Sequence, residues 1–329
     1  MLAKPKSERL IWLDIMLTLL PLEIMAYFYY GVKIVAVSLC CIAVSLAAEL
    51  AVLRLRSRKF TADDLSCTSD ALIISLMMPA AIGVGIPAAG CVFAVLIIRN
   101  LFGGRRNMIF SPAAVGYLFI LTSWKDELLM YPRTYARTGL FEEAEELVHS
   151  ASHTFNTTGK LDISDFELLM GSFPGPVGAV SVLLLAVVAA VLIFRRDISG
   201  GAFLGTILGM AFMAYVCPVT DIAADSVKYM LATNMTLFAA IYIISDKRIA
   251  PEKNYYAFFY GLLISVLSYV ITITTGKENV IIIMSVLFTP LALVIRTLEE
   301  RIDAERRREL ENREKMQADT PEEGAESNG

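Results

Sequence analysis

Ten predominantly apolar runs follow one another along the chain, separated by short polar or charged segments. A helix needs about 20 apolar residues to cross the ~30 Å hydrocarbon core of a bilayer, and most of the runs approach that length. The third run is short and is interrupted by Pro79. The pattern therefore predicts an all-α polytopic membrane protein with about ten transmembrane helices. The runs lie at about 10–31, 34–53, 69–82, 85–101, 109–123, 176–194, 201–217, 227–246, 255–275 and 279–296.

The distribution of basic residues sets the orientation of these helices. If the N-terminus is cytoplasmic and each run crosses once, 22 of the 29 Lys and Arg residues fall on the inside and seven on the outside. Lys and Arg concentrate in cytoplasmic loops of membrane proteins, and a miscount by one span would scramble the split. We therefore expect both termini in the cytoplasm.

The loops divide the chain into two membrane halves. A cytoplasmic N-terminus (1–9) precedes five spans (10–123), an outside loop (124–175), five further spans (176–296) and a charged cytoplasmic tail (297–329). The halves start from opposite sides, so a structural repeat between them would be inverted.

The third run of each half is polar and irregular, from Ser69 to Pro79 and from Thr233 to Pro251. Paired broken helices at matching positions indicate a binding site near the membrane midplane. Packing of two polar helices through hydroxyl groups remains the alternative.

The composition agrees with a membrane protein and excludes several classes of function. Hydrophobic residues make up 56% of the chain and charged residues 19%, and the mean hydropathy is +0.59, whereas soluble domains are about 45–50% apolar and ~25% charged. A net charge of −4 gives no reason to expect nucleic acid. The five cysteines form no CxxC spacing, and two histidines exclude a His-rich metal site, so we predict no bound metal.

Four polar residues stand inside the apolar runs: Asp14, Glu23, Glu49 and Asn234. Charged groups in hydrocarbon are costly, so they normally face a protein interior or water. An ion or proton pathway is one interpretation, and a snorkelling or hydrogen-bonded carboxyl group is the other.

Several motifs, in order along the chain, carry a resemblance to a known family. They are Ser69 to Pro79 with Gly83 and Pro87; Phe102-Gly103-Gly104 with Asn107, Phe110, Pro112-Ala113 and Val115-Gly116-Tyr117; Gly171 to Gly175 with Gly178; and Thr236-Leu237-Phe238-Ala239-Ala240 to Ser245-Asp246 and Pro251. On these residues the chain resembles the NqrB/RnfD family of integral-membrane subunits of ion-translocating electron-transport complexes. The short N-terminus makes it more similar to RnfD.

The resemblance implies a covalent flavin. In this family FMN is joined through its phosphate to a threonine of the outside loop, and Thr154 falls on that position in Ser150-Ala151-Ser152-His153-Thr154-Phe155-Asn156. Ser152-His153 and Phe155 depart from the family pattern. Attachment at the neighbouring Thr157 or Thr158 remains open, as does a protein without covalent flavin, in which the loop is only a solvated connection. The NqrB branch also implies a second, non-covalent flavin such as riboflavin, for which this sequence has no signature.

The function implied by the resemblance is that of RnfD in an Rnf-type complex, an electron relay rather than a stand-alone catalyst. Such complexes pass electrons between ferredoxin and NAD and move Na⁺ or H⁺ across a bacterial or archaeal cytoplasmic membrane. The implied partners are the other Rnf-type subunits (A, B, C, E and G), a flavin transferase and the lipid bilayer. The candidate cofactor-binding residues are Thr154, Ser152, His153, Arg105, Asn107, Ser111, Ser75, Asn234, Thr236 and Asp246.

No residue of the chain is proposed as a catalytic acid, base or nucleophile, and Gly83 and Gly85 do not make an NAD-binding motif. Two other functions remain as alternatives. One is an inverted-repeat channel or transporter for a small solute without covalent flavin. The other is a structural membrane anchor, for which the charged tail from Arg296 to Lys315 offers either a docking strip or a solvated helix.

Overall fold

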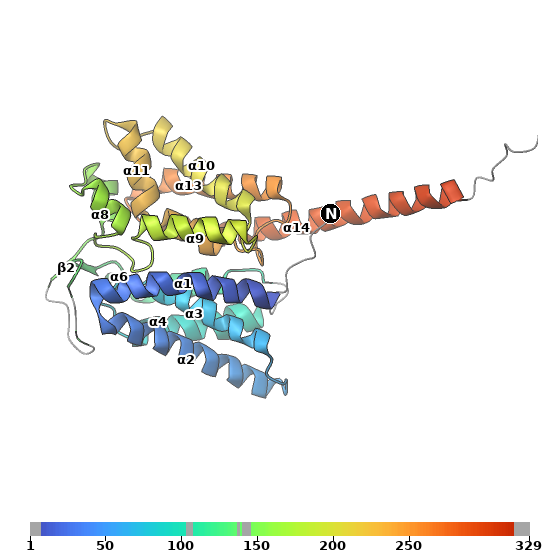
Figure 1. The fold of residues 1–329 in the computed structure, drawn as a ribbon, viewed down its shortest axis with the longest axis horizontal. Coiled ribbons are helices and arrows are strands. Elements are labelled where there is room, and N and C mark those ends of the chain that lie inside the picture. The colour runs from blue at the N-terminus through green and yellow to red at the C-terminus, as the bar shows by residue number, and fades with distance from the viewer. Residues whose placement is uncertain (1–7, 103–107, 137–138, 140–145, 319–329) are drawn as a thin grey trace, which may run out of the picture.

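The computed structural model describes residues 8–102, 108–136, 139 and 146–318. Its helices run side by side in one elongated bundle, and the last helix continues far beyond the bundle at one end (Figure 1). We call this the tail end. The segment between the two halves lies at the opposite end, which we call the loop end (Figure 1).

Each of the ten apolar runs contains a helix in the structure. The first half comprises α1 (Glu8–Tyr30), α2 (Val32–Leu55), η1 (Ala62–Ser66), α3 (Cys67–Leu76), α4 (Gly85–Phe93), the π-helical turn η2 (Ala94–Arg99) and α5 (Pro112–Ser123). The second comprises α9 (Val182–Phe194), α10 (Gly200–Val216), α11 (Ala223–Thr233), α12 (Thr236–Ala239), the π-helical turn η3 (Ala240–Ile244), α13 (Asn254–Thr275) and α14 (Val280–Ala318).

Four of these helices are long and apolar enough to cross a membrane: Arg9–Tyr30, Val32–Leu55, Asn254–Thr275 and Val280–Leu310. The pair Ala223–Thr233 and Thr236–Ile244 would make a fifth span, bent by 57° at its break. Several shorter apolar helices lie among them. The described chain is thus an all-α membrane protein, while ten crossings in two inverted halves stay a prediction.

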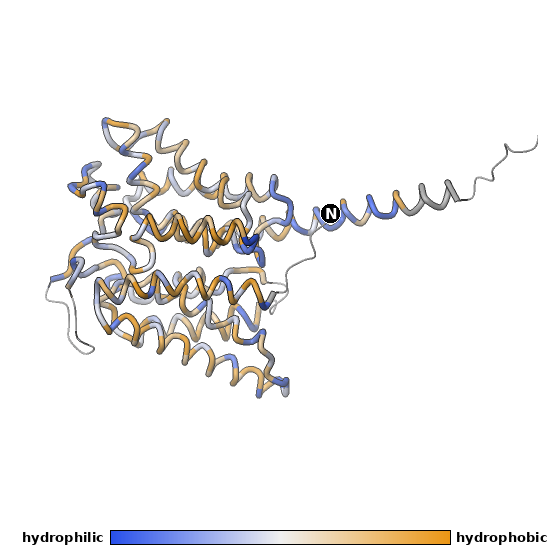
Figure 2. Tube along the Cα trace, in the orientation of Figure 1, coloured by the Kyte–Doolittle hydropathy of each residue, from blue (hydrophilic) through white to orange (hydrophobic). Residues whose placement is uncertain are grey.

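Large apolar side chains on the outside of the bundle agree with a lipid environment. Phe194 is 90% exposed, and Leu17 and Phe212 are each 63% exposed. Apolar positions fill the length of the bundle, and hydrophilic ones gather at its ends and on the helix that leaves it (Figure 2). A surface with many large apolar side chains fits contact with the hydrocarbon of a bilayer.

The segment between the halves contains only short helices and strands. It contains α6 (Lys125–Leu128), a two-stranded antiparallel pair of β1 (Tyr131–Pro132) and β2 (Leu147–Val148), α7 (Ala151–Thr158) and α8 (Asp165–Met170). The strand pair was not expected from the sequence. Tyr131 pairs with Val148, which places the start of α7 next to residues that follow α5.

An unusually close helix contact joins α10 to α13 through glycines spaced four residues apart. A Cβ atom on Gly201 would lie 2.1 Å from the Asn254 carbonyl oxygen, and one on Gly205 would lie 2.0 Å from that of Phe258. Small residues at such spacing let two membrane helices approach backbone to backbone, where dispersion and packing hold them.

We expect Gly205→Leu to destabilise the folded chain by about 3 kcal/mol or more, because the added side chain meets rigid backbone rather than a movable side chain. Gly200→Ala is the matched control, since its Cβ would only touch Ile193 at 3.9 Å. Thermal unfolding in detergent, followed by size exclusion, measures both. Equal midpoints for the two variants would show that the close crossing is unimportant.

Candidate functional site

Helix α7 is a short, capped helix that carries the predicted flavin-attachment threonine. The Ser150 side chain accepts a hydrogen bond from the His153 backbone N–H at 3.0 Å, and Gly159 ends the helix with a φ of 69°. Ser at the N-cap and Gly in the left-handed conformation after the last turn are strong helix boundaries. The local sequence alone therefore specifies where α7 begins and ends.

One face of α7 packs on the break between α11 and α12. At that break Met235 has a φ of 55°, which interrupts the helix and frees backbone carbonyls. The Ser152 hydroxyl donates to the Thr233 carbonyl at 2.5 Å. The amide of Asn156 donates to the Asn234 side chain at 2.6 Å and accepts from it at 3.2 Å. The second broken helix is thus completed by side chains of α7.

Thr236, the first residue of α12, satisfies a backbone carbonyl that the same break leaves free. Its hydroxyl donates to the Met230 carbonyl at 3.1 Å. Backbone groups freed inside a membrane protein must find partners in the protein, because lipid offers none. Ser152, Asn234 and Thr236, all predicted from the sequence to bind a cofactor, therefore lie together here and make hydrogen bonds within the protein.

Glu278, between α13 and α14, holds the start of α7. Its carboxylate accepts hydrogen bonds from the Ser150 hydroxyl and, at 2.6 Å, from the Tyr131 hydroxyl. Burial raises the pKa of the Glu278 carboxyl above its ordinary value of 4.5, against the opposing effects of the Ser150 and Tyr131 hydrogen bonds. Three segments distant in sequence thus meet at one buried carboxyl group.

The raised pKa of Glu278 predicts a pH dependence of stability. Above pH 4.5 the folded state keeps a proton that the unfolded state has lost, so stability falls as pH rises from 4.5 through the folded-state pKa. Glu278→Gln removes this titration, although it adds a constant offset because one acceptor oxygen is lost. We expect the thermal midpoint of the wild type, relative to that of the variant, to decline from pH 4.5 toward neutrality. Parallel curves would contradict the assignment.

The opposite face of α7 presents three threonine hydroxyls. Thr154, Thr157 and Thr158 are all exposed, so exposure alone does not choose among them. Thr154 lies near the start of α7 and its hydroxyl donates to the Ser150 carbonyl at 3.1 Å, whereas Thr157 and Thr158 lie at its end. A phosphate is favoured at a helix N-terminus and disfavoured at a C-terminus. This asymmetry favours Thr154.

The two histidines lie at the start of α7. His149 precedes α7, His153 lies within its first turn, and their rings are 4.7 Å apart. They are the only histidines of the chain. An imidazole next to a phosphoester supplies a hydrogen-bond donor in either protonation state.

The first broken helix is completed by the segment that leads into α9. Helix α3 ends at Leu76, and the Leu76 and Met78 carbonyls accept hydrogen bonds from Gly178 and Val177 at 2.7 and 3.1 Å. A Cβ on Gly178 would lie 2.6 Å from that of Leu76. Only glycine allows this approach. The pairing also explains why α9 begins at Val182 and not near residue 176 as the apolar run predicted.

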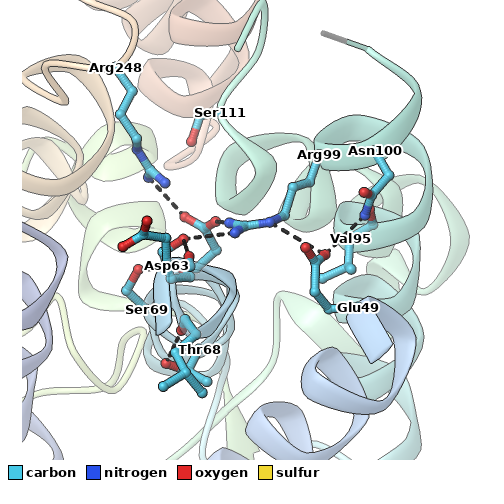
Figure 3. A network of polar contacts seen from close by, with 12 residues as sticks. Glu49, Asp63, Thr68, Ser69, Val95, Arg99, Asn100, Ser111 and Arg248 are labelled. Atoms are coloured by element: carbon cyan, nitrogen blue, oxygen red, sulfur yellow. Dashed lines mark hydrogen bonds and ion pairs between the residues drawn. The ribbon is translucent and has the colours of Figure 1, made fainter. Parts of the chain in front are cut away.

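A buried ionic cluster closes the tail end of the bundle (Figure 3). Arg99, 1% exposed, lies between Glu49 of α2 and Asp70 of α3, with nitrogen–oxygen distances of 3.5 and 3.4 Å. Arg248 contacts the other Asp70 oxygen at 2.9 Å and Asp246 at 2.7 Å. Asp70 therefore bridges guanidinium groups of the two halves.

Further contacts extend this junction between the halves. The Arg296 guanidinium on α14 donates to the Arg248 carbonyl at 2.6 Å. On α1, Asp14 pairs with Arg195 at the end of α9 at 2.7 Å. Of the residues that stood inside apolar runs, Asp14 and Glu49 thus form ion pairs within the protein. Glu23 lies beside Ser38 of α2.

The remaining predicted site residues lie apart from α7. Ser75 accepts a hydrogen bond from Ser38 at 3.0 Å and donates to the Leu72 carbonyl. Ser111 caps α5, and Asp246 belongs to the ionic cluster. Arg105 and Asn107 lie outside the described residues. The predicted set therefore divides between the two ends of the bundle, with Ser75 inside the first half.

Two pockets open near the tail end. One of about 180 Å³ is lined by residues of α1, η1 and α3 together with Lys247, Arg248 and Arg296. A larger one of about 1000 Å³ lies between α9, α10 and α13. Neither is lined by Ser75, Asn234, Thr236 or Asp246.

Three residues with central roles had no predicted function. Glu278 stands in a short polar loop and resembles any solvated carboxylate. Arg99 and Arg248 were counted only as cytoplasmic charges, yet Arg99 is fully buried. A signal existed for Arg99, because Glu49, Asp70 and Arg99 all lie near the inner ends of neighbouring runs.

The chain is similar to known proteins over most of its length. A sequence model of the NQR2, RnfD, RnfE family matches residues 2–296. The D subunit of a Na⁺-translocating ferredoxin:NAD⁺ oxidoreductase complex of Acetobacterium woodii is 24% identical over 292 residues, 88% of each chain. The B subunit of a Na⁺-translocating NADH-quinone reductase of Yersinia pestis is 24% identical over 228 residues, which is 67% of this chain and 55% of that relative.

The D subunit of an ion-translocating oxidoreductase complex of Shewanella sediminis is 26% identical over 156 residues, 47% of this chain and 44% of the relative. The match thus spans about half the length of two of these three relatives and most of the third.

Proposed function

Because the chain belongs to the NQR2, RnfD, RnfE family, we propose that it is the flavin-carrying membrane subunit of an Rnf-type complex that couples electron transfer between ferredoxin and NAD to Na⁺ or H⁺ translocation. The Acetobacterium woodii relative is matched over 88% of its own length, which supports the Rnf branch. In this proposal the loop end faces outward and the tail end, with both termini, faces the cytoplasm.

The observation that carries the proposal is the position of Thr154. An exposed hydroxyl near the start of a capped helix, on a segment docked against a broken membrane helix, fits a phosphoester link to FMN. Esterification replaces the hydroxyl hydrogen, so the hydrogen bond from Thr154 to the Ser150 carbonyl is given up. A net loss of about 1 kcal/mol is small against a covalent bond. The residues present fit the group.

The protein's part is to hold the attachment point in place. Ser152 and Asn156 fix α7 on the broken helix, and Glu278 fixes its start through Ser150. Burial raises the pKa of the Glu278 carboxyl above its ordinary value, so burial opposes negative charge at the start of α7. The His153 ring, adjacent in sequence, would donate a hydrogen bond to the phosphate. A bound flavin supplies one- and two-electron redox chemistry that no side chain offers.

The finer parts of the proposal concern partners and location. The proposal includes the cytoplasmic membrane of a bacterium or archaeon as the location, and the other Rnf-type subunits and a flavin transferase as partners; family membership supports these parts of it. A second flavin such as riboflavin belongs to the NqrB branch and stays a prediction for this chain. The coupling ion is Na⁺ or H⁺, since membrane carboxylates serve both.

Affinity purification of the tagged chain, coexpressed with the genes that neighbour its own, tests the proposal. We expect the other subunits to copurify and the assembly to reduce NAD⁺ with reduced ferredoxin. A stand-alone transporter would purify without them and move its solute into vesicles alone. That outcome would replace the proposal.

A further inference from the structure

The larger tail-end pocket is an open groove beside the α10–α13 crossing. Its volume is about 1000 Å³, and it is bounded by the end of α9, the start of α10 and the start of α13. We refer to it as the α9–α10–α13 groove. Its lining residues are all described in the structure, and none belongs to α7 or to the ionic cluster. It therefore has no part in the flavin site.

One wall of the groove is apolar and continues onto the lipid-facing surface. Ile193, Leu204 and Phe258 line it, and Leu204 is 51% exposed. Tyr255 lines it too and is 54% exposed. Water beside these apolar side chains has few polar partners, and hydrocarbon would surround this part of the helices in a membrane. An acyl chain is the occupant that such a wall fits.

The other wall of the groove is polar and predominantly cationic. Arg196, Lys247, Ser199 and Gly200 line it, and Glu252 is its one acidic residue. The Lys247 ammonium donates to the Arg196 carbonyl at 2.5 Å, which holds it at this wall. The Arg196 side chain is exposed. The wall thus presents two basic side chains to whatever occupies the groove.

Two further basic residues of this end lie outside the groove and form ion pairs with carboxylates. Arg195 pairs with Asp14, and Lys253 with Asp303, each at 2.7 Å. The space over Gly200 is open, since an added Cβ would meet only Ile193 at 3.9 Å. Gly200 begins a 17-residue helix that the Ser199 hydroxyl caps by accepting a hydrogen bond from the Ala202 N–H at 3.4 Å, and the positive end of the helix dipole lies at this start. The N-terminus of α10 and the side chains of Arg196 and Lys247 all favour an anionic group at this position.

We propose that the α9–α10–α13 groove is a binding site for an anionic phospholipid. The phosphate lies against Arg196 and Lys247 near Ser199, and an acyl chain follows Leu204 and Phe258 along α10 and α13. Apolar and cationic walls of one groove match the two ends of such a lipid. This site is independent of the proposed electron transfer, because it requires neither flavin nor partner subunits.

Native mass spectrometry of the purified full-length chain tests the site. The chain in detergent is titrated with dioleoyl phosphatidylglycerol, with dioleoyl phosphatidylcholine, and with dioleoyl phosphatidylglycerol in the presence of excess inorganic phosphate. We expect one phosphatidylglycerol to bind in preference to phosphatidylcholine, and inorganic phosphate not to compete. Arg196→Gln and Lys247→Gln should each weaken phosphatidylglycerol binding about fivefold. Lys253 lies at the same end of the bundle but does not line the groove. Lys253→Gln should therefore leave phosphatidylglycerol binding unchanged.

A second variant separates the lipid site from a general effect of charge. Leu204→Trp fills the apolar wall without altering any charge, and it should weaken binding of the same single lipid. Thermal midpoints of all variants show whether each is folded. Equal binding of both lipids, unaffected by the groove variants, would show annular lipid only and overturn the proposal. Displacement by inorganic phosphate would overturn it as well, by showing a simple anion site.

Discussion

We expect Thr154→Ala, coexpressed with a flavin transferase, to yield a chain without covalent flavin, and the wild type under the same conditions to carry one. The loss is expected to be complete, because a phosphoester cannot form without the hydroxyl. Ultraviolet fluorescence of the chain on a denaturing gel measures it, since only a covalently held flavin stays with the unfolded polypeptide. The stability of the protein should hardly change, because the Thr154 side chain is exposed and makes one local hydrogen bond.

The neighbouring threonines provide matched controls. Thr157 and Thr158 are exposed on the same helix and bond to carbonyls one turn back, as Thr154 does. Thr157→Ala and Thr158→Ala should therefore stay fluorescent. A dark band for either one, with a fluorescent Thr154→Ala, would move the attachment point along α7. A dark wild-type band in the presence of active transferase would remove the covalent flavin.

Arg99→Met should be the most destabilising single change at the tail end. It leaves Glu49 buried without its cation and Asp70 with Arg248 alone. Breaking a buried ion pair by removing one partner typically costs about 3–5 kcal/mol. We expect a large drop in the folded fraction after detergent extraction, measured by fluorescence-detected size exclusion, and a lower thermal midpoint.

The control for this variant is an exposed ion pair between an arginine and a glutamate. Arg133 and Glu146 lie 2.9 Å apart with side chains 67% and 60% exposed, and such pairs contribute about 0–1 kcal/mol. Arg133→Met should be close to neutral. Adding Glu49→Gln to Arg99→Met removes the stranded carboxylate and should restore part of the lost stability. No recovery, or an equal effect at Arg133, would show that burial of the cluster is not the cause.

The sequence was informative wherever local pattern decides structure. Apolar runs of membrane length became helices, because a chain in lipid must satisfy its backbone hydrogen bonds within each segment. Helix α7 was not predicted, because the sequence pattern indicated only an outside loop over 124–175, although Ser150 and Gly159 lie at its ends as N-cap and C-cap residues. The irregular third runs are broken in the structure, at Leu76 and at Met235.

The partners of those breaks could not be predicted, because they come from distant parts of the chain. Ser152 reaches Thr233 over 81 residues, and Ser150 reaches Glu278 over 128. The resemblance grouped Asp246 with Asn234 and Thr236, but these residues lie along one membrane run and their positions in space depend on tertiary packing. The burial of Arg99 could not be predicted either, because the count of basic residues on each side of the membrane says nothing about which of them are buried.

Peptide mapping by mass spectrometry shows whether Thr154 carries FMN. Trypsin is expected to cut after Arg137 and Lys160, so one peptide, 138–160, contains Thr154, Thr157 and Thr158. We expect this peptide from the mature protein to carry one FMN, located on Thr154 by fragmentation. An unmodified peptide from a chain that matured with an active transferase would show that this protein does not carry a covalent flavin.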